Sequence, residues 1–391
     1  MILNLNYPHR ASYYDDWLDA FVQSRHFLCS VENIIGLKAK TLEAKIRDFD
    51  AVIILHSCSS DTLQYLEPLA SALAARKGAK LLVFVGNEYN SPYVSMTRRI
   101  GFLKSARADF VATQLLLEAG EYLYGQTECR TVSIPHALNP IAFSPGGSSD
   151  RDYDLGVKGF RYPPYLGDDD RNIFISQISA SARDLGLKTD ISEDQRLSRN
   201  DWAAFLGNCR GTVSTETGSF YLSPDDDLMN EIHRYLRSKD RGFVLKSEGK
   251  LRSAARHLPA GVKSTLWKLL RLGPLKFEMI EDFNTSFAEL EAKFFKTCAR
   301  APVYSKAISS RHFDAIGTKT CQIMLEGRYN DILVPDVHYI PVKSDLSNIG
   351  DSLAAFSDPG YSSKISEQAY EFVLENHTYV HRAKAVFDLL G

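Results

Sequence analysis

Short apolar runs alternate with helix-like stretches along most of this chain, and that alternation limits the folds open to it. Five strand-like runs occur in the first third, at 2–6, 51–55, 80–85, 110–112 and 131–134. Strands that are apolar on both faces are buried on both faces, which is typical of a parallel sheet covered by helices. The pattern therefore predicts an α/β protein that begins with a doubly wound, Rossmann-like domain over residues 1–145.

The segments between these runs repeat apolar residues every three or four positions, as amphipathic helices do. Helices are expected at 13–23, 63–76 and 115–124. The second of them carries four leucines at this spacing: Leu63, Leu66, Leu69 and Leu73.

A stretch rich in Pro, Gly and Ser follows at 135–149 and predicts a linker. The alternation then restarts, with strands expected at 153–157, 211–214, 321–325 and 337–340 and helices at 172–185, 201–208 and 364–390. We expect a second Rossmann-like domain over 151–375 that faces the first domain across a cleft. A helix at 376–391, after a break near His377, is expected to cross back to the first domain.

The formal charge of −2 conceals a strongly basic stretch. Residues 234–276 hold twelve Lys and Arg against two acids, so the stretch carries 12 − 2 = +10 and the rest of the chain −12. It lies in 224–297, which we interpret as a mostly helical insertion into the second domain, without strands. A near-neutral total therefore does not exclude an anionic partner.

Within 246–276 the basic residues are interleaved with apolar ones, and 262–272 places apolar residues on one helical face. This pattern fits a helix on an anionic membrane surface, which is an expected partner, and equally a helix packed on its own domain. Nucleic acid is not an expected partner, since no known nucleic-acid module accompanies the patch.

No signal sequence or membrane span is predicted, because the start lacks a basic region before an apolar one and no apolar run approaches the ~18 residues of a transmembrane helix. The six cysteines are scattered without a Cys-x-x-Cys pair, which predicts reduced thiols and no structural zinc. We expect a cytoplasmic protein. If the basic stretch binds an anionic membrane, the protein is peripheral at the inner face of that membrane.

Polar residues follow the predicted strands of the first domain, where open parallel sheets bind ligands. The loops at 7–10, 56–61, 86–90 and 113–114 supply four candidates for a general base: His9, His56, Asp61 and Glu88. No Gly-x-Gly-x-x-Gly follows a strand and no P-loop is present, which disfavours a dinucleotide dehydrogenase or a P-loop NTPase.

The second domain offers a sharper pattern. Ser309 or Ser310 can cap a helix that carries Arg311 and Asp314 in its first turns and ends at Gly317. A helix N-terminus and an Arg fork suit a diphosphate, and a carboxylate one turn later can accept ribose hydroxyls. A capped surface helix with an Arg–Asp pair fits the same residues, so both interpretations stay open.

The two-domain layout, the linker at 134–145 and the segment 311–317 resemble glycosyltransferases of the GT-B fold. The closest resemblance is to the group 1 and spore-maturation-protein-like members of bacterial surface-polysaccharide clusters. Residues 376–383 look like that family's closing helix, and 335–347 resemble a segment of lipopolysaccharide-modifying and O-glucosyl-type transferases. The resemblance covers most of the chain outside 224–297. It implies transfer of a sugar from a nucleotide-diphosphate donor to a glycan or lipid-linked acceptor in surface-polysaccharide assembly.

Many retaining members of that family carry a Glu-x7-Glu pair, with the first Glu near the donor sugar and the second on the ribose. By this resemblance, Glu216 is the catalytic carboxylate and Asp314 the ribose ligand, although far more than seven residues separate them. Arg311 and Lys319 are expected to offset the diphosphate charge. The complete set expected to bind the nucleotide sugar is Arg311, His312, Asp314, Gly317, Thr318, Lys319, His338 and Tyr339.

The resemblance favours a retaining enzyme, which needs no general base, whereas an inverting enzyme would use a first-domain base such as His56 or Glu88. It also implies no metal and no cofactor, because protein groups neutralise the diphosphate. The acidic runs 168–170 and 225–227 are expected to cap helices or face water. Two alternatives remain: a catalytically inert GT-B-fold binding or assembly protein, and a nucleotide-sugar epimerase.

Overall fold

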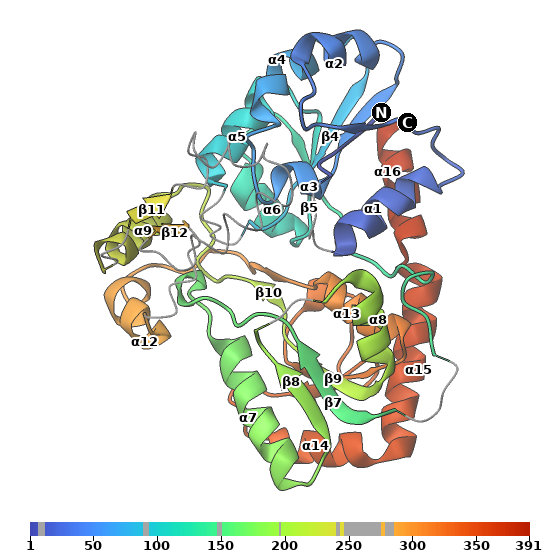
Figure 1. Cartoon of the computed structure of the whole chain (residues 1–391), viewed down its shortest axis with the longest axis vertical. Coiled ribbons are helices and arrows are strands. Elements are labelled where there is room, and N and C mark those ends of the chain that lie inside the picture. The colour runs from blue at the N-terminus through green and yellow to red at the C-terminus, as the bar shows by residue number, and fades with distance from the viewer. Residues whose placement is uncertain are drawn as a thin grey trace.

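Two α/β units, each built on a parallel sheet, lie one above the other in Figure 1. The structure is a computed structural model that describes residues 1–6, 12–88, 94–146, 151–194, 197–239, 243–245, 275–277 and 285–391. We call the part around the N-terminal sheet the first unit and the part around the other large sheet the second unit. The prediction of an α/β protein with doubly wound parallel sheets is confirmed.

The sheet of the first unit has six described strands in the order β2-β1-β3-β4-β5-β6, and every neighbouring pair is parallel. The strands are β1 (Ile2–Asn4), β2 (Val31–Asn33), β3 (Ala51–Ile54), β4 (Lys80–Phe84), β5 (Phe110–Thr113) and β6 (Arg130–Ser133). The helices are α1 (Ser12–Val22), α2 (Ala39–Ile46), α3 (His56–Ser59), the 3-10 turn η1 (Glu67–Leu69), α4 (Ala70–Ala74), α5 (Met96–Ser105) and α6 (Leu117–Tyr124).

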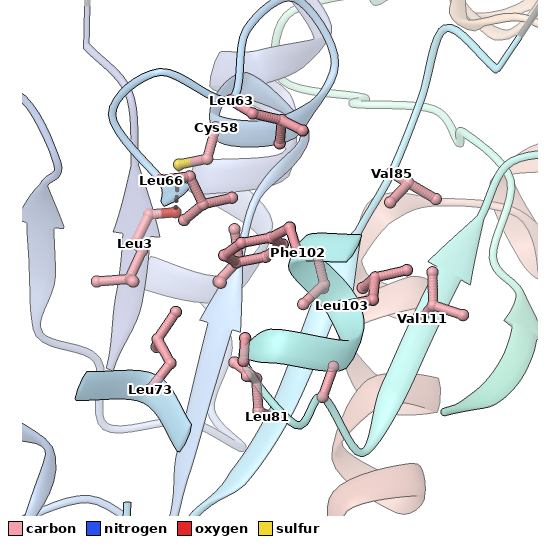
Figure 2. Packing of buried hydrophobic residues seen from close by; sticks show 14 of the residues in the cluster. Leu3, Cys58, Leu63, Leu66, Leu73, Leu81, Val85, Phe102, Leu103 and Val111 are labelled. Atoms are coloured by element: carbon pink, nitrogen blue, oxygen red, sulfur yellow. Dashed lines mark hydrogen bonds between the residues drawn. The ribbon is translucent and has the colours of Figure 1, made fainter. Parts of the chain in front are cut away.

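Successive residues of β4 point to opposite faces of this sheet, and both faces are buried. Leu81 packs among the helices on one face, together with Leu73 and Phe102 (Figure 2), and Val83 belongs to the same buried cluster. On the other face, Leu82 and Phe84 belong to the cluster that includes Trp17 of α1. Burial of both faces explains why β4 appears in the sequence as an unbroken apolar run.

The predicted helix at 63–76 is wrong in extent. Leu63, Leu66, Leu69 and Leu73 are all buried, but only η1 and α4 are helical. Pro68 lies in the first turn of η1. Because proline has no N–H and its ring clashes with the preceding turn, it starts a helix rather than continuing one.

The second unit has five described strands in the order β15-β14-β9-β7-β8, again all parallel. They are β7 (Tyr153–Lys158), β8 (Thr189–Ser192), β9 (Cys209–Ser214), β14 (Cys321–Leu325) and β15 (Ile340–Val342). A small antiparallel pair joins β10 (Thr217–Gly218) to β13 (Lys306–Ala307). The helices are η2 (Pro164–Leu166), α7 (Asp170–Asp184), α8 (Arg199–Gly207), α13 (Ser310–Gly317), η4 (Tyr329–Asp331), α14 (Ile349–Ser357), α15 (Pro359–Asn376) and α16 (Tyr379–Leu390).

The strand predicted at 337–340 is displaced, since β15 runs from Ile340 to Val342. Pro341 lies in the middle of it, opposite Met324 of β14. Proline has no N–H for a ladder, and β15 tolerates it because this strand is at the edge of the sheet.

The expectation that 224–297 contains no strand is wrong. Besides α9 (Asp227–Lys239), α12 (Phe287–Leu290) and the π-helical turn η3 (Glu291–Phe295), it holds β11 (Phe243–Leu245) and β12 (Leu275–Phe277). These two strands pair in parallel. Each has only three residues, too few for an alternating pattern to stand out. Residues 246–274, which carry most of the basic stretch, lie outside the described residues.

The C-terminal helix packs on the first unit. Tyr379, Ala383 and Val386 of α16 share a buried cluster with α1 and β3, and Figure 1 shows α16 running beside α1. The segment before α16 is hydrogen-bonded to the linker. The backbone N–H of Leu138 donates to the carbonyl of His377, and the carbonyl of Leu138 accepts the N–H of Tyr379, both at 2.9 Å. Within the described residues, no helix is both long and apolar enough to span a membrane.

Candidate functional site

Glu216 lies immediately beyond the carboxyl end of β9, and its side chain is 4% exposed. Its Oε2 accepts the hydroxyl of Tyr304, and its Oε1 accepts the backbone N–H of Tyr329 at 2.7 Å. Burial raises the pKa of Glu216, and these two hydrogen bonds oppose the rise. The carboxyl group is therefore held in one orientation at the carboxyl edge of the second sheet.

The side chain of Tyr329 links several of the predicted residues. Its buried ring lies 5.2 Å from the His312 ring and 5.3 Å from the Tyr339 ring, measured between centroids. The pKa of Tyr329 is raised well above its usual value, chiefly by burial and next by the negative charge of Glu216. The positive charge of Arg311 acts to lower it. Glu216, Arg311, His312 and Tyr339 thus surround one tyrosine that the sequence did not single out.

Arg311 is in the first turn of α13 and donates to the Tyr162 hydroxyl at 3.2 Å. A second guanidinium, from the buried Arg171, lies 4.9 Å from the centroid of the same ring. Burial, and next the charge of Arg311, lowers the pKa of Arg171 to about 10. Burial alone would raise the pKa of Tyr162, but the two guanidiniums outweigh it and lower that pKa.

Two guanidiniums that contact the same ring form a site that favours an anion. The Nε of Arg171 has no hydrogen-bond partner among the described residues, and its Nη1 lies 3.4 Å from the Glu193 carboxylate. Arg171 and Tyr162 were not predicted, because neither belongs to a recognisable motif and both lie far from Arg311 in sequence.

His312 takes part in the capping of its own helix. Ser309 is the N-cap residue of α13, and its backbone N–H donates to His312 Nδ1 at 3.0 Å. Burial, followed by the charge of Arg311, lowers the pKa of His312 to about 3, so the ring is neutral. Of the two serines predicted as possible caps, Ser309 is the one that caps the helix, while a ligand contact of His312 stays a prediction.

Asp314 is buried beneath Trp202 of α8, whose Nε1 donates to its carboxylate at 3.0 Å. Burial, and then the nearby carboxyl of Asp16 on α1, raises the pKa of Asp314 well above its ordinary value. Arg199 pairs with Asp16 at 2.9 Å, so this junction also connects the two units. The predicted ribose contact of Asp314 stays a prediction.

Gly317, Thr318 and Lys319 lie at the opposite end of α13 from Arg311. A methyl group on Gly317 would approach Leu138 to 2.5 Å, so this glycine allows α13 to pack on the linker. Thr318 donates to the carbonyl of Ala315 at 3.0 Å. Lys319 is paired with Glu367 of α15 at 2.7 Å. The structure does not bring these three residues to the Arg311 end, because a whole helix separates them from it.

His338 and Tyr339 are neighbours in sequence but point to different surroundings. Tyr339 packs against Tyr329, as described above. His338 stacks on Phe372 of α15, with 4.5 Å between centroids, and accepts the N–H of Val334 at 3.1 Å. Burial lowers the pKa of His338. His338 is therefore not grouped with Glu216.

In the first unit, Glu88 follows β4 and is 4% exposed. The Thr113 hydroxyl donates to its carboxylate at 2.5 Å. The nearby loop is held by Arg99, which donates to the Gly86 carbonyl at 2.9 Å. Among the other base candidates, Asp61 accepts from Tyr14 and Asn87, and His9 lies outside the described residues.

His56 is fully buried between the rings of Trp17 and Phe84, with centroids 5.2 and 4.9 Å away. Burial, and next the neighbouring His136, lowers the pKa of His56 well below its usual value. Within the described part of the chain, neither His56 nitrogen has a partner, and the same holds for Ser60 Oγ and Gln114 Nε2.

These unpaired atoms surround Gly86, at the carboxyl ends of β3, β4 and β5. A methyl group on Gly86 would lie 2.8 Å from Ser60 Oγ and 3.7 Å from Gln114 Nε2. Buried polar atoms are normally hydrogen-bonded, so this cluster calls for a further polar group.

The two acidic runs are occupied by protein contacts. Lys306 pairs with Asp168 at 2.8 Å and with Asp170 at 3.1 Å. Asp226 accepts the backbone N–H groups of Met96 and Thr97 at 2.7 and 3.0 Å, and so caps α5 of the first unit. No group of three or more His, Cys, Asp or Glu side chains suited to a metal occurs in the described ranges.

Residues 282–388 match the sequence model of a family described as glycosyl transferase-like. The matched segment contains α13, the loop after β14, and α14 to α16, and therefore carries Arg311 and Tyr329. No curated protein matches the chain.

Several solved structures are similar in fold over most of the chain. HepE from Anabaena, in complex with UDP-glucose, has 13% identity and a TM-score of 0.44, covering 100% of this chain and 98% of that one. An α,α-trehalose-phosphate synthase from Burkholderia vietnamiensis has 14% identity and a TM-score of 0.41, covering 90% and 75%. A sucrose-phosphate synthase from Thermosynechococcus elongatus has 12% identity and a TM-score of 0.42, covering 100% and 87%. Likenesses this remote do not indicate an activity.

Proposed function

We propose that this chain is a GT-B-type glycosyltransferase that moves a sugar from a nucleotide-diphosphate donor to a glycan or lipid-linked acceptor. The observation that carries the proposal is the pair of guanidiniums, Arg311 and Arg171, that both contact Tyr162. They lie at the carboxyl edge of the sheet that also presents Glu216. The glycosyl transferase-like match over 282–388 includes Arg311 and supports the same reading.

In this proposal, Arg311 contacts the diphosphate, and Arg171, over the Tyr162 ring, adds positive charge nearby. The backbone N–H groups in the first turn of α13 contribute to the same anion site. Two guanidiniums stabilise the negative charge that develops on the departing diphosphate. The protein groups thereby supply the neutralisation that a metal gives elsewhere, so no metal or cofactor is proposed.

The acceptor is proposed to bind to the first unit, near Gly86. Ser60 Oγ and Gln114 Nε2 are polar, buried and without a partner among the described residues. Hydroxyl groups of a glycan can both donate and accept, so they suit such atoms.

We propose retention of configuration. His56 is fully buried with a strongly lowered pKa, and Glu88 is held by Thr113, so neither is well suited to take a proton from the acceptor. In the retaining reaction, the bond from the anomeric carbon to the diphosphate oxygen breaks. A bond to the acceptor oxygen forms on the same face, and the acceptor proton passes to the departing diphosphate. Glu216 faces the sugar and stabilises its positive charge.

Calorimetric titration with a panel of nucleoside diphosphates tests the donor site, and at least one is expected to bind. Incubation of the matching nucleotide sugar with acceptor extract should then release the nucleoside diphosphate, and the anomeric configuration of the product tests retention. Absence of binding to every member of the panel at millimolar concentration would refute the proposal. Isomerisation of the sugar without acceptor would instead indicate an epimerase.

Contact with an anionic membrane through 246–276, at the inner face of the membrane, remains part of the proposal. Salt-sensitive binding to anionic liposomes is expected. Binding that is equally strong to neutral liposomes would count against it.

A further inference from the structure

The loop after β14 adopts an unusual backbone conformation. Tyr329, Asn330 and Asp331 have φ angles of 46°, 54° and 58°. Left-handed backbone is costly for residues other than glycine, and a run of three persists only where surrounding contacts impose it. The contacts of this loop therefore indicate what the strained conformation is for.

Asn330 connects the two units through its side-chain amide. Its Nδ2 donates to the carbonyl of Gln114, at the end of β5 in the first unit, at 2.9 Å. Its Oδ1 accepts the backbone N–H of Ile308 in the second unit at 2.8 Å. A peptide carbonyl only accepts and a peptide N–H only donates. These two partners therefore determine which end of the Asn330 side chain is the oxygen and which is the nitrogen. Asparagine also tolerates the left-handed region better than most residues.

The same loop encloses the carboxyl group of Glu216. Tyr329, next to Asn330, supplies the N–H that Oε1 accepts at 2.7 Å. The backbone N–H of Arg328 donates to Tyr304 at 3.3 Å, and Tyr304 in turn donates to Glu216. A methyl group on Gly327 would lie only 2.3 Å from Glu216 Oε2. A shift of this loop would therefore move or release the carboxyl group.

Asn330 also reaches the helix that carries Arg311. Ile308, which donates to its Oδ1, directly precedes Ser309, the N-cap residue of α13. One side chain thus touches the first unit, the approach to α13 and the loop around Glu216.

We propose that Asn330 is a positioning residue that couples the approach of the two units to the placement of Glu216. The inference rests on the proposed function, in which an acceptor in the first unit must meet a donor in the second. Reaction requires the two groups to be held close together and correctly oriented. The Asn330–Gln114 hydrogen bond ties the first unit to the loop, and the loop sets Glu216. Loss of that bond leaves the donor site intact but loosens the carboxyl group.

The test is the isosteric change Asn330→Asp. A carboxylate still accepts from Ile308 but puts an anionic oxygen against the Gln114 carbonyl. The Asn330–Gln114 hydrogen bond is therefore lost, while the ion pair between Arg328 of the same loop and Glu118 of α6, at 2.7 Å, remains. The matched control is Asp331→Asn, the reverse exchange at the next left-handed residue, whose carboxylate pairs with the partly exposed Arg328. Asn330→Gly is a second test variant, because glycine adopts this backbone without strain but lacks the amide.

In the full-length protein, Asn330→Asp is expected to lower kcat about tenfold, equivalent to about 1.4 kcal/mol, with KM for the donor and Kd for the nucleoside diphosphate within about twofold. Amide hydrogen exchange at Tyr329 is expected to accelerate in both Asn330 variants and not in Asp331→Asn. Circular dichroism melting checks that each variant is folded.

Wild-type kcat in the folded Asn330→Asp and Asn330→Gly variants would overturn the inference. So would a loss of nucleoside diphosphate affinity at constant kcat. If the wild-type protein binds no nucleoside diphosphate, the proposed function fails instead. The coupling through Asn330 is then tested by amide hydrogen exchange at Tyr329 alone, and an unchanged exchange rate in Asn330→Asp refutes that coupling.

Discussion

The backbone N–H of Tyr329 donates to Glu216 Oε1 at 2.7 Å, which joins the end of β14 to the end of β9. These strands are adjacent and parallel, so their carboxyl ends lie side by side. The contact places a carboxyl group with a raised pKa at the sheet edge that also carries Arg311.

Replacing Glu216 by Gln is expected to reduce glycosyl transfer by at least about a hundredfold, because removal of one preorganised charge contact from a transition state costs about 10²–10³ in rate. The Kd of the nucleoside diphosphate should stay within about twofold, measured by calorimetry beside a transfer assay. Glu326→Gln, which removes an exposed carboxylate two residues before Arg328, is the control and should transfer normally. Equal rates in the two variants would remove Glu216 from the reaction.

Replacing Arg311 by Ala is expected to weaken nucleoside diphosphate binding by about 10–100-fold, since hydrogen bonds to charged groups contribute about 1.5–3 kcal/mol. Lys319→Ala is the matched cation control. Because Lys319 pairs with Glu367 beyond the other end of α13, its loss should change the Kd by less than about twofold. A larger effect of Lys319→Ala than of Arg311→Ala would contradict the proposed diphosphate site.

If Asp314 contacts the ribose, Asp314→Ala should weaken binding of a nucleoside diphosphate but not of inorganic pyrophosphate, which has no ribose. Calorimetry with the two ligands separates these contributions. The variant also leaves the Trp202 N–H without its acceptor, so a loss of about 1–3 kcal/mol in unfolding free energy is expected. An equal loss of affinity for both ligands would show that Asp314 acts on the structure of the site rather than on the ribose.

The stability of the protein should fall in mild acid because of buried histidines. Burial, followed by the charge of Arg382, lowers the pKa of His136 to about 3, from the ordinary 6.5 that it regains on unfolding. The unfolded chain therefore binds an extra proton below pH 6.5, and stability present above that pH is lost as the pH falls toward 3. Each such histidine contributes about 1.4 kcal/mol per pH unit in this window.

Chemical denaturation at several pH values between 7 and 4 measures this slope. His136→Phe removes one titrating group and should make the slope shallower by about 1.4 kcal/mol per pH unit. It also removes the acceptor of the Trp17 indole N–H, which lowers stability at every pH but does not alter the slope. A wild-type slope in His136→Phe would contradict burial of a neutral ring at this position.

The large features of the fold were predictable because they depend on local patterns. Strands buried on both faces, such as β4 and β14, appear as apolar runs and were predicted. Two of the strands that were missed, β2 and β8, lie at sheet edges and are exposed or only partly buried, so they have no such run. The spacing of Leu63, Leu66, Leu69 and Leu73 indicated burial correctly but not helix, because Pro68 interrupts the segment.

The candidate site was predictable only in part. Glu216 follows a strand and Arg311 opens a helix, and both signals are local. Arg171, Tyr162 and Tyr329 have no such signal, because their importance arises from the side chains they meet. His338 and Lys319 are close to the site in sequence, yet both pack against α15 instead.

Local sequence patterns predicted the two doubly wound sheets and a helix capped by Ser309 or Ser310, because hydrophobic periodicity and capping act over a few residues. Which polar groups meet, and which of them are buried, depends on the tertiary structure. It set Tyr329 and Tyr304 on Glu216, Trp202 on Asp314, and a shell of aromatic rings around His56. Burial and hydrogen-bond partners depend on packing between elements that lie far apart in the chain. A local sequence pattern carries no information about that packing.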